Sequence, residues 1–167
     1  LPQPTDGFQL IHTALRAFES PAMFTGIITA IGTLTAIQPR SGDVRLRIAA
    51  GKLDLRDVQL GDSIAVSGVC LTAVELPGDG FWADASRETL ERTILGEAAP
   101  GMKVNLEKAL TPTTRLGGHL VSGHVDGIGT VTVWQLDGRS WRLRIQAPDA
   151  LARYIAEKGS ICVDGVS

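Results

Sequence analysis

The chain has 167 residues, a formal net charge of -2 and 44% hydrophobic residues, a composition that supports a packed core and excludes a disordered chain. Its 16 Lys and Arg residues balance 18 Asp and Glu residues without a basic cluster, which argues against a nucleic-acid partner. No apolar run approaches the roughly 20 residues of a membrane-spanning helix, so we expect no membrane partner. The 19 glycines and 8 prolines favour many turns and short strands.

Residues 1–22 differ from the rest of the chain. The first residue is Leu1 rather than methionine, and residues 8–18 carry a loose helical stripe of apolar side chains without the basic region of a signal peptide. We therefore expect residues 1–22, with His12, to be an appended, non-native extension that takes no part in chemistry.

The remaining chain repeats itself at a spacing of 97 residues. Residues 26–70 lie over residues 123–167 without a gap, and 17 of these 45 positions are identical. This period is too long for a solenoid and indicates two tandem copies of one small domain. The first copy is expected over residues 23–118 and the second, incomplete, over residues 119–167.

The first copy has a mostly β pattern. Polar and apolar side chains alternate in residues 32–37 and 44–48, as they do in a strand with one buried face. Further short strands, separated by glycine turns, are predicted at residues 63–66, 71–74, 81–83 and 103–106. About six short strands per copy predict a closed antiparallel barrel.

Two short helical segments are predicted between the strands. Ser86 is a suitable N-cap for a helix over residues 87–95 that ends at Gly96. A second helical turn precedes the third strand of each copy, and in the second copy it covers residues 149–157 between Pro148 and Gly159.

The second copy stops at Ser167, directly after its third predicted strand. About half of a second barrel is then absent, and the open strand edge would be a liability in water. We expect either a fragment or another element that covers this edge.

Two histidines lie in a glycine-rich connection between the copies. His119 and His124 would need a third ligand to hold a metal, and no cysteine or carboxylate cluster supplies one, so we expect no metal. His124 aligns with Ile27 of the first copy, which suggests a role other than packing, and histidine can exchange a proton near neutral pH. The alternative is a connection that merely contains histidines.

Two cysteines are too few for a disulfide framework, so we expect a reducing, cytoplasmic setting. Cys70 aligns with Ser167, and each follows a Gly-Val turn. Cys70 is either a small buried side chain or a nucleophile or hydrogen-bonding group at the mouth of the barrel. Cys162 aligns with Ala65 inside a strand, where packing explains it. Ser63 matches Ser160 beside a turn.

Five segments in order resemble the riboflavin synthase family of the alpha type. They are residues 23–28, 68–72, 88–93, 117–124 and 164–167. Together with the duplication, they extend the resemblance over residues 23–167.

This resemblance implies an all-β fold of two tandem, homologous six-stranded antiparallel Greek-key barrels, the second truncated here. It implies dismutation of two molecules of 6,7-dimethyl-8-ribityllumazine by transfer of a four-carbon unit, which yields riboflavin and a ribitylamino-pyrimidinedione. It also implies no metal or organic cofactor, a homotrimer held by a C-terminal helix, and a potential association with lumazine synthase. Active sites then form where the first barrel of one subunit meets the second barrel of another.

The resemblance also implies which residues form the site. Removal of a proton from the C7 methyl group of lumazine needs a base, for which we expect His124, with Ser63 and Cys70 orienting or activating a nucleophile. In the first barrel, the expected ligand contacts are Gly26, Ile27, Ile28, Cys70, Leu71, Thr72, Asp84, Ala85, Ser86, Arg87, Glu88 and Thr89. In the second, they are Gly123, His124, Val125, Lys158 and Ser167.

Two alternatives remain open. The same family of two-barrel proteins contains lumazine proteins, which bind a lumazine or flavin as an optical antenna without catalysis; the presence of Ser63, Cys70 and His124 favours the enzyme. A generic barrel that binds another ligand is the second alternative. Because part of the second barrel is missing and residues 1–22 precede the site, we expect this chain to bind lumazine but to turn it over poorly.

Overall fold

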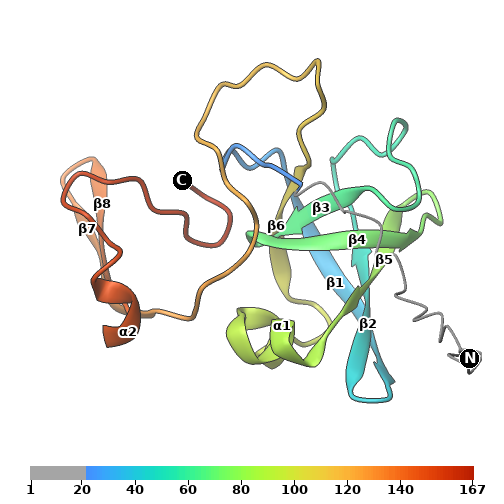
Figure 1. Cartoon of the computed structure of the whole chain (residues 1–167), viewed down its shortest axis with the longest axis horizontal. Coiled ribbons are helices and arrows are strands. Elements are labelled where there is room, and N and C mark those ends of the chain that lie inside the picture. Colours follow the sequence, from blue (N-terminus) through green and yellow to red (C-terminus); the bar gives the residue numbers. More distant parts are fainter. Residues whose placement is uncertain (1–21) are drawn as a thin grey trace, which may run out of the picture.

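The structure, a computed structural model, describes residues 22–167 (Figure 1). Six antiparallel strands form a closed barrel in the order β1-β2-β5-β4-β3-β6. Their bounds are β1 Ala30–Arg40, β2 Asp43–Ala49, β3 Ser63–Val66, β4 Val69–Glu75, β5 Gly80–Ala85 and β6 Lys103–Lys108. The predicted all-β fold with a closed six-stranded barrel is confirmed, whereas the prediction for residues 1–22 falls almost entirely outside the described residues.

The barrel is closed around a core of inward-facing side chains. Leu46, Ile48 and Phe81 are completely buried, while Arg45 and Arg47 alternate with them along β2 on the outer face. Full burial of an aliphatic or aromatic side chain of this size contributes about 1.5–3 kcal/mol. The alternation in the sequence therefore corresponds to the inner and outer faces of the barrel, which the pairing of β1 with β6 closes.

The helix after β5 is shorter than predicted. The structure contains α1, Arg87–Arg92, followed by the 3-10 helix η1, Ile94–Glu97. Ser86 is the N-cap, as predicted, and its Oγ accepts a hydrogen bond from Thr89 N (3.2 Å). Thr93 ends α1 with an extended backbone (φ -136°), and its Oγ1 accepts a hydrogen bond from Leu95 N. Gly96 therefore lies inside η1 and does not terminate a longer helix.

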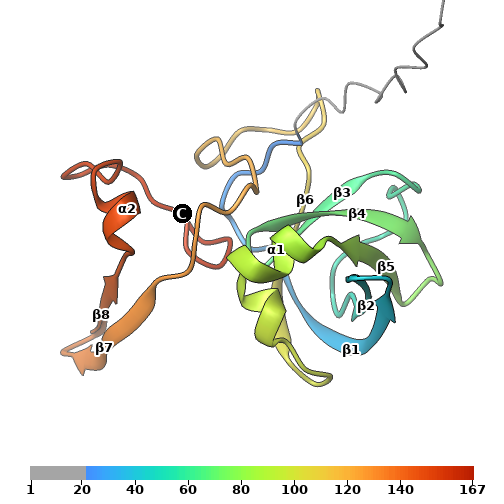
Figure 2. The same ribbon diagram turned by 60° about the horizontal axis from the view of Figure 1, so that its bottom comes forward.

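The second copy forms a smaller unit beside the barrel (Figure 2). Its elements are β7 Thr130–Asp137, β8 Ser140–Gln146 and α2 Asp149–Ala152. β7 and β8 form a two-stranded antiparallel sheet. The third strand predicted at residues 160–163 is absent, and only an isolated bridge joins Val163 to Val166. In the first copy β3 pairs with β4 and β6, and no counterpart of either strand occurs in the second unit among the described residues.

The helical turns predicted before the third strands are also shorter than expected. In the second unit α2 ends at Ala152 rather than Glu157, and the following backbone hydrogen bonds, such as Tyr154 N to Leu151 O (2.9 Å), span three residues as in turns. In the first copy the segment between β2 and β3 contains hydrogen-bonded turns instead of a helix, for example Val58 N donating to Leu55 O (3.1 Å).

No helix within residues 22–167 combines the length and the apolar character that crossing a membrane requires.

Candidate functional site

The two copies meet through residues that are equivalent in the repeat. Phe24 and Val121 are 97 positions apart, and they pair with each other as an antiparallel bridge. Phe24 N donates to Val121 O (2.7 Å), and Val121 N donates to Phe24 O (3.0 Å). A residue that pairs with its own equivalent lies on a local two-fold axis, so this bridge marks a pseudo-two-fold axis between the copies.

Contacts on either side of the bridge are exchanged between the copies. Ser167 N donates to Gly26 O (3.0 Å), and Cys70 N donates to Gly123 O (2.9 Å). Gly26 is the equivalent of Gly123, and Cys70 is the equivalent of Ser167. Both glycines have positive φ, 74° and 71°, and a Cβ at Gly26 would collide with Ser167. The two sides of this contact are therefore built by the same hydrogen bonds in opposite directions.

A pair of turns completes this pseudo-symmetric contact. Gly68 and Gly165, again equivalent, approach so closely that a Cβ on Gly68 would lie 2.6 Å from Gly165 N, and one on Gly165 would lie 2.9 Å from Gly68 N. The preceding residues, Ser67 and Asp164, have matching left-handed backbones with φ of 47° and 50°. Glycine is required here because the two backbones touch.

The predicted catalytic residues lie on or beside the outer face of β3 and β4. Cys70 and Thr72 point outward from β4 and alternate with buried, inward-facing residues of the same strand, and Ser63 of β3 is paired with Thr72. The hydrogen bond from Cys70 N to Gly123 O brings His124 next to this face. The structure thus brings Cys70 close to the His124 backbone, and Ser63 lies on the same outer face of the barrel as Cys70.

His124 itself is exposed, and its backbone amide is held by a local side-chain hydrogen bond. Ser122 Oγ accepts a hydrogen bond from His124 N (3.2 Å), just as Thr25 Oγ1 accepts one from Ile27 N (3.2 Å) at the equivalent position. The next residue, Val125, packs against the core of the first barrel. The imidazole is therefore carried on a segment that is anchored on both sides and remains open to a ligand.

His119 has a hydrogen-bonding role that the sequence alone did not reveal. Its Nδ1 lies 2.7 Å from Ser167 Oγ and its Nε2 lies 3.1 Å from Ser160 Oγ. Its backbone N donates to Thr25 O (3.0 Å). An imidazole bonded to two hydroxyl groups can accept a proton from one of them, which is the arrangement that general base catalysis on a hydroxyl group requires. His119 aligns with Ala22, outside the gap-free repeat, and this concealed it.

The segment from Asp84 to Thr89 is largely engaged in structural contacts. Arg45 donates two hydrogen bonds to the Asp84 carboxylate, from Nε (2.6 Å) and Nη2 (2.8 Å), and a third to Glu75 (2.7 Å). The hydrogen bonds from Arg45 lower the pKa of Asp84 below its usual value. Ala85 and Leu71 face the barrel core, so either could contact a ligand only through its backbone.

Two remaining predictions concern charged residues. Arg87, predicted to contact the ligand, forms an ion pair with Glu91 (2.9 Å) on the exposed face of α1. Lys158 is exposed in a turn with φ of 59°, and its side chain forms no hydrogen bond or ion pair with any other residue of the described chain. The structure does not bring Lys158 together with Cys70 and His124 through any contact.

Burial changes the acidity of two groups close to the contact between the copies. Desolvation raises the pKa of the Cys162 thiol, and the nearby carboxylates of Glu107 and Asp164 raise it further. Desolvation also raises the pKa of Asp164. Within residues 22–167, no group of three or more histidine, cysteine or acidic side chains is arranged to hold a metal ion.

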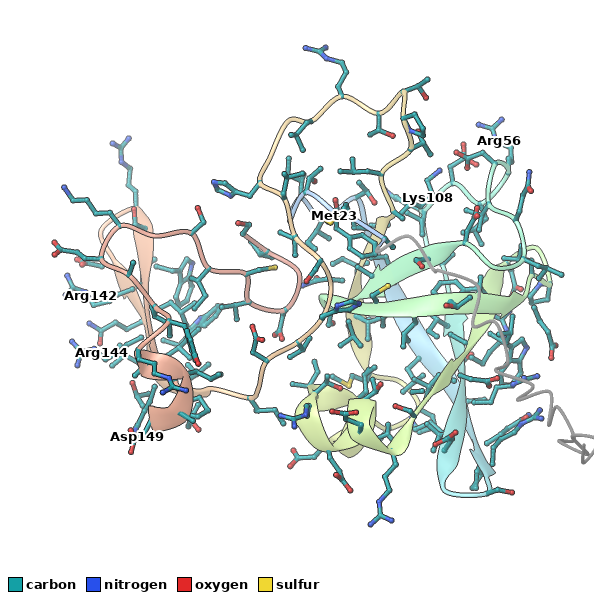
Figure 3. The ribbon with its side chains drawn as sticks, in the orientation of Figure 1. Met23, Arg56, Lys108, Arg142, Arg144 and Asp149 are labelled. Carbon is teal, nitrogen blue, oxygen red and sulfur yellow. The ribbon has the colours of Figure 1, made fainter. Side chains whose placement is uncertain are left out.

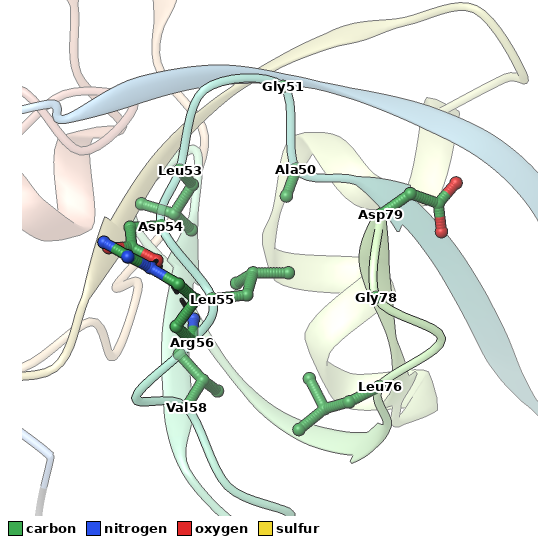
Figure 4. Close-up of a pocket in the computed structure, with 10 residues that line it drawn as sticks. All are labelled: Ala50, Gly51, Leu53, Asp54, Leu55, Arg56, Val58, Leu76, Gly78 and Asp79. Carbon is green, nitrogen blue, oxygen red and sulfur yellow. Dashed lines mark hydrogen bonds and ion pairs between the residues drawn. The ribbon is translucent and has the colours of Figure 1, made fainter.

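A separate cavity of 440 Å³ lies at another part of the barrel (Figure 4). Most of its lining is apolar, with the Asp54–Arg56 ion pair at its edge. The lining residues are Ala50, Gly51, Leu53, Asp54, Leu55, Arg56, Val58, Leu76, Gly78 and Asp79. None of the residues predicted to bind a ligand lies in this cavity.

Comparison with known proteins gives a consistent result. The family described as "Lumazine binding domain" matches residues 25–109 and 122–167. The chain is 48% identical over 145 residues to the riboflavin synthase of Photobacterium phosphoreum, covering 87% of this chain and 66% of that enzyme. It is 48% identical over 147 residues to the riboflavin synthase of Mycobacterium tuberculosis, covering 87% of this chain and 72% of that enzyme. The chain thus spans about two thirds of the length of these curated relatives.

A solved structure agrees with this assignment. The crystal structure of LumP complexed with 6,7-dimethyl-8-(1'-D-ribityl) lumazine superimposes with a TM-score of 0.74 at 28% sequence identity. The match covers 86% of this chain and 76% of that chain.

Proposed function

The chain belongs to the lumazine-binding domain family, and from this premise we propose that it is a riboflavin synthase. The reaction is the dismutation of two 6,7-dimethyl-8-ribityllumazine molecules into riboflavin and 5-amino-6-ribitylamino-pyrimidinedione. The observation that carries the proposal is the 48% identity to riboflavin synthases over 87% of the chain. The exchanged contacts of the two copies support it, because a reaction between two identical molecules is served by two equivalent half-sites.

The proposed chemistry begins with removal of a proton from the C7 methyl group of one lumazine. The carbanion is stabilised by delocalisation into the heterocycle, and His124 is the proposed acid–base group. Cys70 and Ser63 lie on the same outer barrel face and are proposed to orient or activate the nucleophile that adds to the donor lumazine. His119, bonded to Ser167 and Ser160, is a second group able to move a proton.

Approximation of the two substrates is proposed to supply the largest share of the rate. Holding two reactants in a reactive orientation can contribute up to about 7–11 kcal/mol in favourable cases. The expected contacts to the first lumazine come from Gly26–Ile28, Cys70–Thr72 and residues 84–89. Those to the second come from Gly123–Val125, Lys158 and Ser167. The backbone groups among them are suited to the polar edge of the pyrimidine ring.

The proposal extends to the organisation of the protein and its setting. We place two lumazine-binding units over residues 23–118 and 119–167, with residues 1–22 as an extension outside the chemistry. We also place the full-length protein in the cytoplasm as a homotrimer that needs no cofactor, with lumazine synthase as a candidate partner.

The deciding experiment is titration of 6,7-dimethyl-8-ribityllumazine into the purified chain, followed by absorbance and fluorescence for riboflavin. Binding with riboflavin formation supports the synthase. A family member with lumazine bound, LumP, supports a second candidate, an antenna protein that only binds. Binding of one lumazine per chain without product, also in a chain extended to the full length of its relatives, would favour that candidate. The absence of binding by a folded chain would contradict both.

A further inference from the structure

Glu107 is a buried carboxylate outside the barrel core. It lies in β6 next to Leu106, which points into the barrel and is completely buried, so the Glu107 side chain is on the outer face. It is nevertheless only 5% exposed. It forms no salt bridge with any residue between 22 and 167. A buried carboxylate without a cation is costly unless several donors satisfy it.

The donors come from the segment that enters the barrel. Thr25 N and Thr25 Oγ1 each donate to Glu107 Oε1 (2.6 Å for both), and Gly26 N donates to Oε2 (3.1 Å). Both carboxylate oxygens are therefore used, and two of the three donors are backbone amides. Met23 is held beside the end of the same strand, where its carbonyl accepts a hydrogen bond from Leu110 N (2.7 Å) (Figure 3).

The segment held by Glu107 contacts the second copy at the proposed site. Thr25 O accepts from His119 N (3.0 Å), and Gly26 O accepts from Ser167 N (3.0 Å). Ile28 Cδ1 lies 3.2 Å from the position of a Cβ on Gly165. A shift of the Thr25–Gly26 backbone would therefore displace the two residues, His119 and Ser167, that are linked by a side-chain hydrogen bond.

We propose that Glu107 is a positioning residue for the lumazine site, because its carboxylate fixes the Thr25–Gly26 backbone against His119 and Ser167. This inference rests on the proposed function. A glutamine at this position could offer only one acceptor oxygen, and its NH₂ group would face an N–H donor, so the segment would lose at least one charge-assisted hydrogen bond.

The test compares Glu107→Gln with the parent chain, using 6,7-dimethyl-8-ribityllumazine as the probe in a fluorescence titration. Glu107→Gln is expected to raise the Kd about tenfold or more, because a hydrogen bond to a charged group contributes enough for a change of that order. Glu107→Asp should restore part of the affinity. Glu97→Gln, on an exposed glutamate of η1, is the matched control and should leave the Kd unchanged.

Two readouts separate positioning from a general loss of structure. A purely structural defect lowers the fraction of chains that bind but leaves the Kd of the remaining chains unchanged. Amide hydrogen exchange on the free chain should be faster at Thr25 and Gly26 in Glu107→Gln, and unchanged in Glu97→Gln. An unchanged Kd in Glu107→Gln overturns the inference, whatever the exchange rates show.

The outcomes also distinguish the inference from the proposed function. If the parent chain is folded and does not bind lumazine, the proposed function fails, and with it the role of Glu107 at that site. If the parent binds and Glu107→Gln binds equally well, only the inference fails.

Discussion

The first barrel and the second unit contain the same hairpin in two different environments. β1–β2 and β7–β8 share a register irregularity at equivalent positions, Leu34/Ala36 and Val131/Val133. The outcome for the side chains differs, since Leu46 is completely buried and its equivalent Leu143 is 47% exposed. The comparison shows that a hairpin's register is encoded locally, whereas its burial depends on the strands that close the barrel.

Side-chain hydrogen bonds follow the local pattern as well. Thr35 Oγ1 donates to Arg47 O (3.1 Å), and the equivalent Thr132 Oγ1 donates to Arg144 O (3.3 Å). What the second unit lacks, among the described residues, is the counterpart of β3, β4, β5 and β6. Its β7–β8 sheet therefore exposes Trp134 and Trp141, whose rings lie 5.7 Å apart.

The largest expected difference comes from truncating equivalent leucines. Leu46→Ala should lower the free energy of unfolding by about 2–5 kcal/mol, because it opens a cavity in the closed core. Leu143→Ala, the matched change in the second unit, should cost less than about 0.5 kcal/mol. Urea unfolding of both variants measures the contrast. Equal losses would mean that the apolar face of β7–β8 is covered in solution.

The contact between the two turns is the next target. Gly68→Ala should cost about 2–3 kcal/mol, through a strained backbone at φ of 82° and a collision with Gly165. Gly78→Ala is the control, since Gly78 has φ of 95° but open space at its Cβ, and should cost about 1 kcal/mol. Thermal unfolding would reveal the difference, and identical costs would show that the turns do not press on each other.

The helices α1 and α2 differ in their N-caps. This difference predicts a smaller change in the free energy of unfolding than the glycine substitutions do. Ser86→Ala should cost about 1 kcal/mol by removing the N-cap of α1. Pro148→Ala should change the free energy of unfolding by less than about 0.5 kcal/mol, because Pro148 forms no side-chain cap at α2. Chemical denaturation monitored by circular dichroism tests the pair, and a costly Pro148→Ala would reverse this ranking.

The smallest expected effects concern the pH dependence of stability, to which Asp84 and Asp164 contribute with opposite sign. The pKa of Asp84 is lowered in the fold by Arg45, so its stabilisation is present above the unfolded pKa of about 3.9 and is lost as pH falls through the folded value. The pKa of Asp164 is raised by burial, so its contribution is favourable at low pH and is lost as pH rises through the folded value.

Substitution should separate these two contributions. Between pH 2 and pH 6, stability should rise less steeply with pH in Asp84→Asn than in the parent, and more steeply in Asp164→Asn. Urea midpoints across this range are the measurement. Parallel curves of stability against pH for all three chains would show that neither carboxyl group has a different pKa in the folded and unfolded states.

Most of the barrel could be predicted from the sequence because polar and apolar residues alternate along its strands and the whole pattern repeats. Alternation predicts the strands around Leu46, and the repeat at a spacing of 97 residues predicts a second hairpin. The end of α1 was not predictable in this way. Thr93 leaves the helical conformation, and its Oγ1 accepts a hydrogen bond from Leu95 N at the start of η1, a local detail that the polarity pattern does not encode.

The site was only partly predictable for a different reason. Cys70 and His124 are conspicuous residue types in a repeat, and the structure places them in one region. From the sequence, Glu107 is expected to be an ordinary outward-facing residue of a strand. Its proposed role depends on Thr25, which is 82 positions away in the sequence. His119 is similar, since its partners Ser160 and Ser167 approach it only through the contact between the copies.

The exchanged contacts at Gly26 and Gly123 have an evolutionary consequence. In a homodimer of a single-barrel ancestor, each of these contacts would occur twice, and every mutation at the interface would change both halves together. Duplication and fusion into one chain free the two halves to diverge. The first copy has Cys70 where the second has Ser167, and Ile27 where the second has His124, which are differences of this kind. One chain can thereby carry two related but chemically different surfaces at equivalent positions.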